Sequence, residues 1–420
     1  MPVTPPEIRE IPFAAWAERV SQSTLREILA LLARPGLLSF ALGMPAAELF
    51  PVEAYARATG RVLGTEPDAL QYGMPLARLR AQVVELMARR GVACTEGQVF
   101  ITSGAQQAMS LLGQLLVSPG ATVVTEELTY DGMLNSLRPL QPRALTVPGH
   151  PRTGLDVDAL EALLEAGERP ALVYAIPEGH NPLGNSMPHA ARRRLADLAR
   201  RWGVPVIEDD AYGLLEYDAD GPPALRAYDP EWVLYVGSFS KIMAPGLRVG
   251  WVVAPEAVVQ RLSILKQGSD LDVSTFAQRA LAAFLDEEPF GEHLAHLCGA
   301  YAQRRDAMLA AMEDSFPAGA RWVAPRSGMF VWVEMPEGVD TSALLRRAVD
   351  EAGVAFVPGR AFCSAGGVRG GHGLRLNFSG LAPEQIHVGI RRLARVLEPR
   401  PVAIPLGPGF SLAPAEPAVA

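Results

Sequence analysis

One lysine in this sequence is a candidate for covalent chemistry. Lys241 lies in the segment GSFSKIMAPGLRVGW (237–251), between two serines and a glycine-containing turn. The chain has only one other lysine, Lys266, among its 38 lysine and arginine residues, so arginine carries nearly all of the positive charge. A guanidinium stays protonated and is a poor nucleophile, whereas a buried amine can lose its proton and attack a carbonyl. The retained lysine therefore indicates Schiff-base formation.

Hydroxyl and guanidinium groups surround this lysine in a pattern suited to a phosphate. The pattern is S-x-S-K-x6-R, formed by Ser238, Ser240, Lys241 and Arg248. A second phosphate signal is ITSGAQQA (101–108), which follows an apolar run and opens a helix, where backbone N–H groups face an anion. The N–H groups concerned are those of Gly104, Ala105 and Gln106. Such a turn alone is more often a plain strand-to-helix connection, but together the two patterns favour a phosphate site.

The same segment also fits an acyl-serine enzyme. Ser238 to Lys241 reads S-x-x-K, the nucleophile motif of β-lactamases and penicillin-binding proteins. That chemistry requires S-D-N and K-T-G elements downstream, and neither occurs in this sequence. The sequence therefore disfavours acyl-serine chemistry.

The composition is that of a globular protein with two domains as the natural expectation. The chain has 420 residues, a charged fraction of 20% and a net charge of −8. It contains no Lys/Arg run that would indicate nucleic-acid binding and no apolar stretch long enough to span a membrane. In the densest basic stretch, ARRRLADLARRWG (191–203), Leu195, Leu198 and Trp202 recur at helical spacing, so its arginines are expected to form a solvated helix face.

The cysteines and the first residues of the chain indicate the cellular compartment in which we expect the protein. Cys94, Cys298 and Cys363 are scattered without metal-ligand spacing and do not suggest a disulfide framework. The start, MPVTPPEIREIPF, has no basic region followed by an apolar run, so no signal peptide is expected. These features favour a cytoplasmic protein without a metal site.

Short apolar runs that look like buried strands must position the candidate residues. They are ATVVTEE, ALVYAIP, VPVIEDD and WVLYVGS, and helical patterns such as AQQAMSLLGQLLV lie between them. This alternation predicts an α/β domain with a largely parallel sheet over residues 52–285. The polar residues that follow the runs are Tyr130, Asn181, Asp209 and Lys241. Because ligands bind beyond the carboxyl ends of such strands, we expect these side chains to share a site.

On these residues the chain resembles the fold-type I, pyridoxal-phosphate-dependent aminotransferases of class I. The segments SFSKIMAPGLRVGW (238–251) and EDDAY (208–212) together carry the resemblance. The similarity extends from QSTLREIL (22–29) to GLRLNFS (373–379), nearly the whole chain. Within this family the sequence is most similar to the branch of 2-aminoadipate and kynurenine aminotransferases.

The resemblance implies two domains. The large cofactor-binding domain, 52–285, would hold a mostly parallel seven-stranded sheet flanked by helices. A smaller α/β domain would combine part of an N-terminal segment, 1–51, with residues 286–398. The proline-rich end, 399–420, is expected to be a disordered tail.

The resemblance also assigns roles around the cofactor ring. Lys241 would form the Schiff base (internal aldimine) with pyridoxal 5′-phosphate and move a proton between the substrate Cα and C4′ of the cofactor. Asp209 would pair with the pyridine nitrogen, although an aspartate at a strand end is more often a surface carboxylate. Asn181 and Tyr212 would hydrogen-bond the phenolic oxygen, and Tyr130 would lie on the ring face. Without the resemblance, these three are a turn residue and two packing aromatics.

The phosphate site would include a residue from a second subunit. Within one chain, the resemblance implies phosphate contacts from Gly104, Ala105, Gln106, Ser238, Ser240 and Arg248. Tyr72, in LQYGM, would reach the same phosphate from a neighbouring subunit. The implied assembly is a homodimer with shared active sites.

Three further residues would bind the substrate. Arg375, in GLRLNFS, would clamp the α-carboxylate as a bidentate pair, and an arginine in a late apolar strand is costly to bury without such a partner. Gly43 would add a backbone contact to that carboxylate, and Asn181 would also face the substrate. Arg26, in STLREIL, occupies the position that can meet an acidic side chain in this branch, and a surface arginine on a helix is an equally good interpretation.

Four departures from the family pattern lie on the substrate side. LGMP (42–45) replaces G-G-x-P, PEGHNP (177–182) replaces P-x-F-Q-N-P, Leu128 replaces the proline of P-T-Y, and the loop after Tyr72 is shortened. None of them removes a cofactor contact. His180 is either an additional acid and base or a side chain that fills the space of the missing aromatic residue.

Three functions remain open at this level. The first is an aminotransferase acting between an L-amino acid and a 2-oxo acid. The second keeps the fold and cofactor but diverts the reaction to oxidative deamination, decarboxylation, or β- or γ-elimination or replacement. The third is a non-catalytic sensor, as in regulators that fuse this fold to a winged-helix domain. Too few residues precede QSTLREIL for such a domain, and an inactive scaffold would tolerate arginine at position 241.

Overall fold

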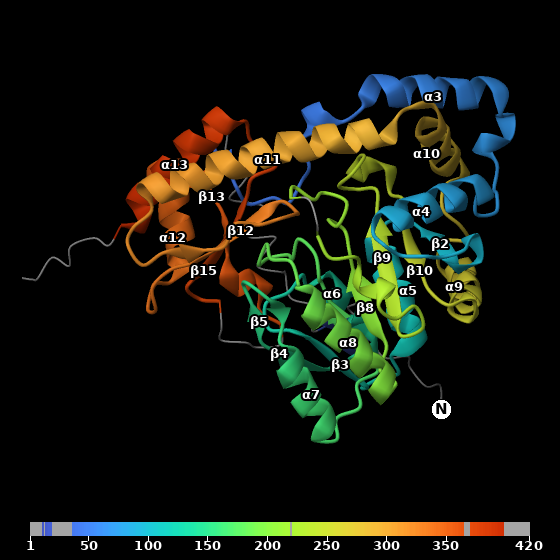
Figure 1. Cartoon of the computed structure of the whole chain (residues 1–420), viewed down its shortest axis with the longest axis horizontal. Coiled ribbons are helices and arrows are strands. Elements are labelled where there is room, and N and C mark those ends of the chain that lie inside the picture. Colours follow the sequence, from blue (N-terminus) through green and yellow to red (C-terminus); the bar gives the residue numbers. More distant parts are fainter. Residues whose placement is uncertain (1–10, 12, 19–35, 219–220, 365–369, 399–420) are drawn as a thin grey trace, which may run out of the picture.

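Two sheets organise the described part of the protein (Figure 1). The computed structural model describes residues 11, 13–18, 36–218, 221–364 and 370–398. The predictions for Arg26 and for the tail at 399–420 lie outside these residues.

The larger sheet has seven strands and confirms the predicted architecture. Its order is β2 (Val99–Thr102), β10 (Gly250–Val253), β9 (Val233–Ser238), β8 (Val206–Asp209), β7 (Leu172–Ala175), β3 (Thr122–Glu126) and β4 (Arg143–Val147). Strand β10 runs antiparallel to both of its neighbours, and the remaining neighbours pair in parallel. The carboxyl ends of β3, β7, β8 and β9 therefore meet at one edge of the sheet.

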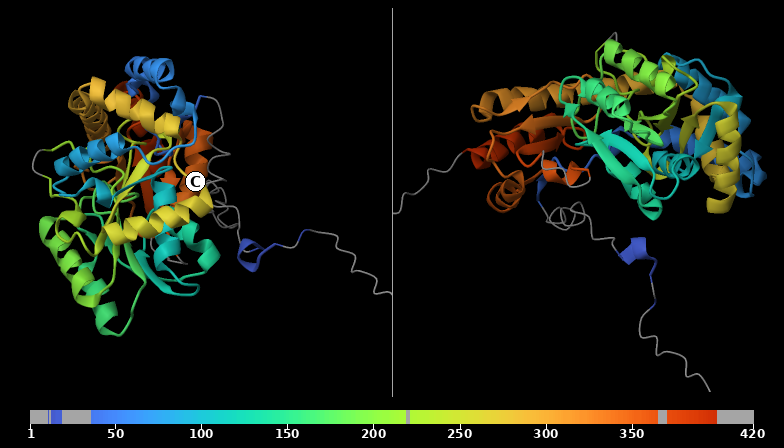
Figure 2. Two further views of the ribbon diagram at one scale, coloured as in Figure 1. Left: turned by 90° about the vertical axis from the view of Figure 1, so that its right-hand side faces the viewer. Right: turned by 90° about the horizontal axis from the view of Figure 1, so that it is seen from below.

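Helices cover both faces of this sheet (Figure 2). Successive side chains of a strand point to opposite faces, so each strand contributes to two cores. Val123 of β3 packs with α5 (Ala105–Leu116) on one face, whereas Val124 packs with α7 (Val157–Glu165) and α8 (His189–Trp202) on the other. Because both faces are buried, the strands read as continuous apolar runs in the sequence.

The second sheet is antiparallel and comes from the C-terminal part of the chain. Its order is β11 (Arg321–Trp322), β12 (Phe330–Glu334), β15 (Gly373–Asn377) and β14 (Val357–Pro358). The long helix α11 (Phe290–Ser315) packs along α13 (Pro383–Leu397) beside this sheet (Figure 1). The strand β1 (Leu38–Ser39) pairs with β13 (Val354–Ala355), so an early segment of the described chain meets a late one here. We propose that the two sheets mark the two domains predicted from the sequence.

The remaining helices complete the layers around both sheets. They are α1 (Ala15–Glu18), α3 (Val52–Thr65), α4 (Ala77–Arg89), α6 (Gly132–Leu137), α9 (Glu256–Ser269), α10 (Thr275–Glu287) and α12 (Thr341–Arg347), and the short strands β5 (Gly149–His150) and β6 (Gly154–Leu155) form a separate pair. Among the helices described, none combines the length and the apolar character needed to cross a bilayer.

One arginine of the basic helix α8 corrects the expectation of a fully solvated arginine face. Arg192 is completely buried, while its neighbour Arg193 is exposed. The Arg192 guanidinium donates to the carbonyls of Met187 and Pro177 at 2.8 Å and to the Glu178 carboxylate at 2.5 Å. The hydrophobic spacing of the helix placed this position beside the core, and a buried carboxylate makes a charged residue tolerable there.

Arg192→Met is expected to lower the free energy of unfolding by about 3 kcal/mol or more, because the Glu178 carboxylate would lose its closest charged partner in the interior. Urea denaturation followed by circular dichroism measures this change. Arg193→Met is the matched control. Because this side chain is exposed on the same helix, its replacement should change the free energy of unfolding by less than about 0.5 kcal/mol. Equal losses for both variants would contradict this account.

Candidate active site

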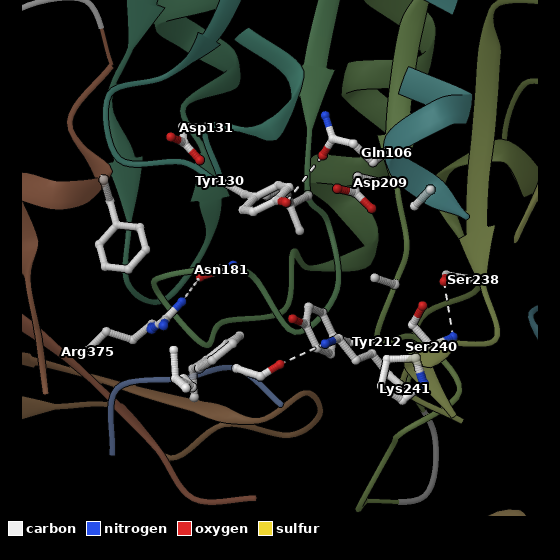
Figure 3. A pocket seen from close by; sticks show the side chains of 18 of the residues that line it. Gln106, Tyr130, Asp131, Asn181, Asp209, Tyr212, Ser238, Ser240, Lys241 and Arg375 are labelled. Carbon is white, nitrogen blue, oxygen red and sulfur yellow. Dashed lines mark hydrogen bonds between the residues drawn. The ribbon is translucent and has the colours of Figure 1, made fainter. Parts of the chain in front are cut away.

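A cavity of about 350 Å³ lies at the carboxyl edge of the large sheet, where the small sheet faces it (Figure 3). The predicted site residues that line it are Gly43, Ala105, Gln106, Tyr130, Asn181, Asp209, Tyr212, Ser238, Ser240, Lys241, Arg248 and Arg375. Gly104 adjoins the cavity as the residue that precedes α5. Tyr72 lies away from it, with 86% of its surface exposed. The structure thus brings together side chains that are far apart in the sequence.

Lys241 follows strand β9 and extends into the cavity. Its Nζ donates a hydrogen bond of 2.7 Å to the carbonyl of Gly43. Burial, followed by the positive charges of Arg375 and Arg248, lowers the pKa of Lys241 to about 8. A useful fraction of the amine is therefore neutral, and able to attack a carbonyl, near physiological pH.

Asp209 ends strand β8 and has one carboxylate oxygen available. Its Oδ2 accepts a hydrogen bond of 2.6 Å from the hydroxyl of Tyr174, while its Oδ1 is buried and has no hydrogen-bond partner within the described ranges. Burial raises the pKa of Asp209 to about 6, so the carboxylate is still mostly ionised at pH 7. A buried anion with an unpartnered oxygen fits a cationic ring nitrogen supplied by a ligand.

The turn before α5 has the geometry of an anion site. Gly104 has a φ of +86°, and a Cβ there would lie 2.5 Å from the Arg248 guanidinium, so only glycine fits. No side chain caps the start of α5, which leaves the first N–H groups of the helix, at Ala105 and Gln106, for a ligand. Ser240 and Arg248 line the same side of the cavity. These residues fit a phosphate group.

The side chain of Gln106 is already engaged. Its Nε2 donates to the carbonyl of Gly132 at 2.8 Å, and its Oε1 accepts from the Tyr130 hydroxyl at 3.3 Å. The second bond ties Tyr130 to Gln106 within the cavity lining (Figure 3). Burial, then the charges of Asp209 and Asp131, raises the pKa of Tyr130 to about 12, so its hydroxyl keeps the proton.

Arg375 reaches the cavity from the small sheet. It lies on β15, with its guanidinium carbon 4.2 Å from the centre of the Phe330 ring and 4.7 Å from that of Phe362. One of its terminal nitrogens donates to Asn181 Oδ1 and the other to the carbonyl of Ala41, each at 2.6 Å. Burial lowers the pKa of Arg375 to about 10, which leaves the group charged at neutral pH. Its Nε has no hydrogen-bond partner among the described residues.

The structure separates the two interpretations of His180. The side chain is fully buried and is not part of the cavity lining. Its Nε2 lies 2.9 Å from Glu126 Oε2, and its Nδ1 accepts the backbone N–H of Leu183 at 3.2 Å. Both ring nitrogens therefore have protein partners. A structural position behind the site describes this residue better than a direct acid and base role.

Sequence reasoning missed two buried residues behind the site. Tyr174 bonds Asp209 from the middle of β7, and Glu126 bonds His180 from the end of β3. The available signals were a polar hydroxyl inside an apolar strand and an acidic residue at a strand end. Neither signal identifies its partner, because that partner comes from another strand.

Comparison with known proteins identifies the family. Residues 37–393 match the family model described as aminotransferase class I and II, so the chain belongs to this family. The 2-aminoadipate transaminase of Thermus thermophilus is 41% identical, with 92% of this chain and 96% of that protein covered. Aromatic-amino-acid aminotransferase 1 of Thermococcus litoralis is 37% identical, with 92% and 94% covered.

A solved structure points to the cofactor. The crystal structure of LysN, an α-aminoadipate aminotransferase from Thermus thermophilus that was solved with N-(5′-phosphopyridoxyl)-L-leucine, superposes with a TM-score of 0.83. It is 41% identical, with 92% of this chain and 97% of that chain covered. This chain is therefore a pyridoxal-phosphate-dependent aminotransferase of fold type I, as the sequence predicted. None of these three names refers to the diverted reactions or to a sensor.

The rate at which cofactor-free enzyme captures pyridoxal phosphate is expected to rise with pH through a midpoint near 8 and then level off, because the neutral amine of Lys241 is the reactive form. Borohydride trapping at each pH, followed by peptide mapping, measures the rate and identifies the labelled lysine. Label on Lys266, or a rate that still rises steeply above pH 10, would contradict the assignment.

Proposed function

We propose that this aminotransferase acts on L-amino acids with extended apolar or aromatic side chains and passes the amino group to a 2-oxo acid. The observation that carries the proposal is the composition of the cavity. Its described lining has three cationic side chains, Lys241, Arg248 and Arg375, and each has a role with the cofactor or the α-carboxylate. The rest of the lining toward the small sheet is apolar, including Phe330, Val357, Ala361 and Phe362.

The chain's own residues divide the work of amino transfer. Pyridoxal phosphate supplies an aldehyde that condenses with amines and a ring that accepts electrons from Cα. Lys241 Nζ would carry the proton that leaves and returns to the substrate Cα, a role that an amine with a pKa of about 8 can fill. Asp209 keeps the pyridine nitrogen protonated, while Asn181 and Tyr212 orient the phenolic oxygen.

Arg375 selects substrates that carry an α-carboxylate. Its guanidinium is held between two aromatic rings, and its Nε–H is not used by the protein residues described. A charge-assisted hydrogen bond to a carboxylate would satisfy this donor in a site from which water is largely excluded. Gly43 lies beside it in the lining and offers a backbone contact.

A homodimer in the cytoplasm is the assembly and location we propose. Leu70, at the end of a short 3-10 helix (Pro67–Leu70), and Tyr72 and Met74 in the loop that follows have exposures of 75%, 86% and 82%. Leu271, which is 62% exposed, is close in sequence to Thr275, and Thr275 contacts this loop at Gly73. So much exposed apolar surface in one loop is typical of an interface, and a second copy would bring Tyr72 to the neighbouring phosphate site. The domain division proposed above would leave each site at the junction of the two sheets.

A second candidate substrate class is acidic amino acids. The relative with 41% identity is named for 2-aminoadipate, which has a carboxylate on its side chain. An additional cation would be needed to bind that group, and Arg26 is the candidate that the sequence offers.

The purified enzyme is expected to convert its bound cofactor to the amine form in a single turnover when leucine or phenylalanine is added, with release of one oxo acid per site. The visible spectrum during titration with a panel of amino acids measures both substrate range and stoichiometry. Continued turnover without an oxo-acid acceptor would instead support one of the diverted reactions.

Arg26→Ala is expected to raise the KM for 2-aminoadipate by about tenfold or more while leaving the KM for leucine within about twofold, because only the acidic side chain would lose a charged partner. Steady-state kinetics with both amino donors provides the comparison. Equal changes for the two donors would exclude side-chain recognition by this arginine.

A further inference from the structure

The second lysine of the chain has no part in the roles assigned above, yet its ammonium is almost fully buried. Lys266 lies on α9, and its side chain is only 3% exposed. Its Nζ donates to Gln107 Oε1 at 2.8 Å and to Asp270 Oδ1 at 2.7 Å. Burial of an ammonium is costly unless it is paired, so this position has a specific use for a positive charge.

The partners of Lys266 form a closed hydrogen-bond network. Gln107 Oε1, which accepts from Lys266, also accepts the backbone N–H of Ser103 at 2.8 Å. Asp270 Oδ2 accepts from Gln107 Nε2 at 2.6 Å and from Ser103 Oγ at 3.0 Å. The carbonyl of Ser103 accepts from Arg248 at 3.2 Å. Ser103 is thus fixed at its N–H, its hydroxyl and its carbonyl.

Residues of this network lie directly before and directly after the proposed phosphate turn in the sequence. Ser103 directly precedes Gly104, and Gln107 directly follows Gln106. Neither Ser103 nor Gln107 lines the cavity, so both act from behind the turn. We propose that Lys266 is a positioning residue, which holds Ser103 and Gln107 through Asp270 so that the N–H groups between them meet the cofactor phosphate. This inference rests on the proposed function and on a phosphate at this turn.

Lys266 also favours phosphate binding through its positive charge. The Asp270 carboxylate belongs to the network that borders the turn, where an unpaired negative charge would repel a phosphate dianion. Lys266 neutralises it through an ion pair of 2.7 Å. Loss of the ammonium would therefore both loosen the turn and expose the phosphate to an uncompensated carboxylate.

The packing around Lys266 favours a lysine at this position, in a chain that otherwise uses arginine. Helices α5 and α9 pack directly against each other, and Lys266 is buried on the α9 side of this contact. A lysine ends in a compact ammonium with three donors, whereas the planar guanidinium is wider and has a fixed fork of donors. Lys266→Arg is accordingly not a conservative change here.

The test compares full-length variants by their affinity for pyridoxal 5′-phosphate and for pyridoxal, which lacks the phosphate. Lys266→Met is expected to weaken binding of pyridoxal 5′-phosphate by about tenfold or more and binding of pyridoxal by less than about twofold. Gln107→Met, which changes no charge and lies on a half-buried helix face, is expected to give a smaller loss with the same selectivity. Equilibrium dialysis with absorbance readout gives all of these dissociation constants.

Arg347→Met is the matched control, because it removes another ion pair, with Glu351 at 3.4 Å, in a segment that does not line the cavity. It should leave the ratio of the two affinities unchanged. An equal loss of both ligands in Lys266→Met and Gln107→Met, or no loss in either, would overturn the positioning role. Wild-type protein that binds no pyridoxal phosphate or transfers no amino group would instead refute the proposed function.

Discussion

The buried guanidinium of Arg375 is the interaction on which the geometry of the site depends. It extends from the small sheet to Asn181, beyond the end of β7, and to the carbonyl of Ala41 near the start of the described chain. A buried charge is costly unless it is hydrogen-bonded, and these two bonds satisfy both terminal nitrogens of Arg375, so the three segments are held together by the cost of separating them. The cavity between the two sheets is a consequence of this arrangement.

Further buried charges stabilise the layer behind the cavity. Arg90, at the end of α4, donates to Asp210 at 3.0 Å, and the Tyr235 hydroxyl reaches the same carboxylate at 3.0 Å. Glu178 joins Arg192 of α8 to Ser327, which precedes strand β12 of the small sheet. The carboxylates of Asp210 and Glu178 therefore each have both a cation and a hydroxyl as partners. Asp209 differs because it lines the cavity, and we propose that its unpartnered Oδ1 meets the cofactor there.

The two lysines show how charged neighbours can give one residue type two different roles. Lys241 is partly buried beside two arginines and has no carboxylate partner among the residues described, and this environment lowers its pKa. Lys266 is buried with the Asp270 carboxylate as its ion-pair partner. The local environment, and not the residue type, separates a chemical role from a structural one.

Much of the fold could be predicted because its signals are local. Apolar runs bounded by turns marked the strands, and their alternation with helical patterns gave the mostly parallel sheet. Tyr130, Asn181, Asp209 and Lys241 all follow strands, which was enough to expect them at one edge of the sheet. Arg192 shows where such reasoning fails, because an arginine next to an apolar helix face can be solvated or buried. Its burial depended on Glu178, a partner outside the helix.

The sequence by itself determined the candidate reactive amine, the candidate phosphate-binding patterns and the strand ends that carry them. These are properties of residue types and short spacings, which do not require knowledge of distant contacts. Tertiary structure alone decided that Tyr174 pairs with Asp209, that His180 pairs with Glu126, and that Lys266 is linked to Ser103 through Gln107 and Asp270. Apart from the local bond between Ser103 and Gln107, these contacts join residues that are far apart in the sequence. Neither segment alone reveals such a hydrogen bond, because only folding brings its donor and acceptor within about 3 Å.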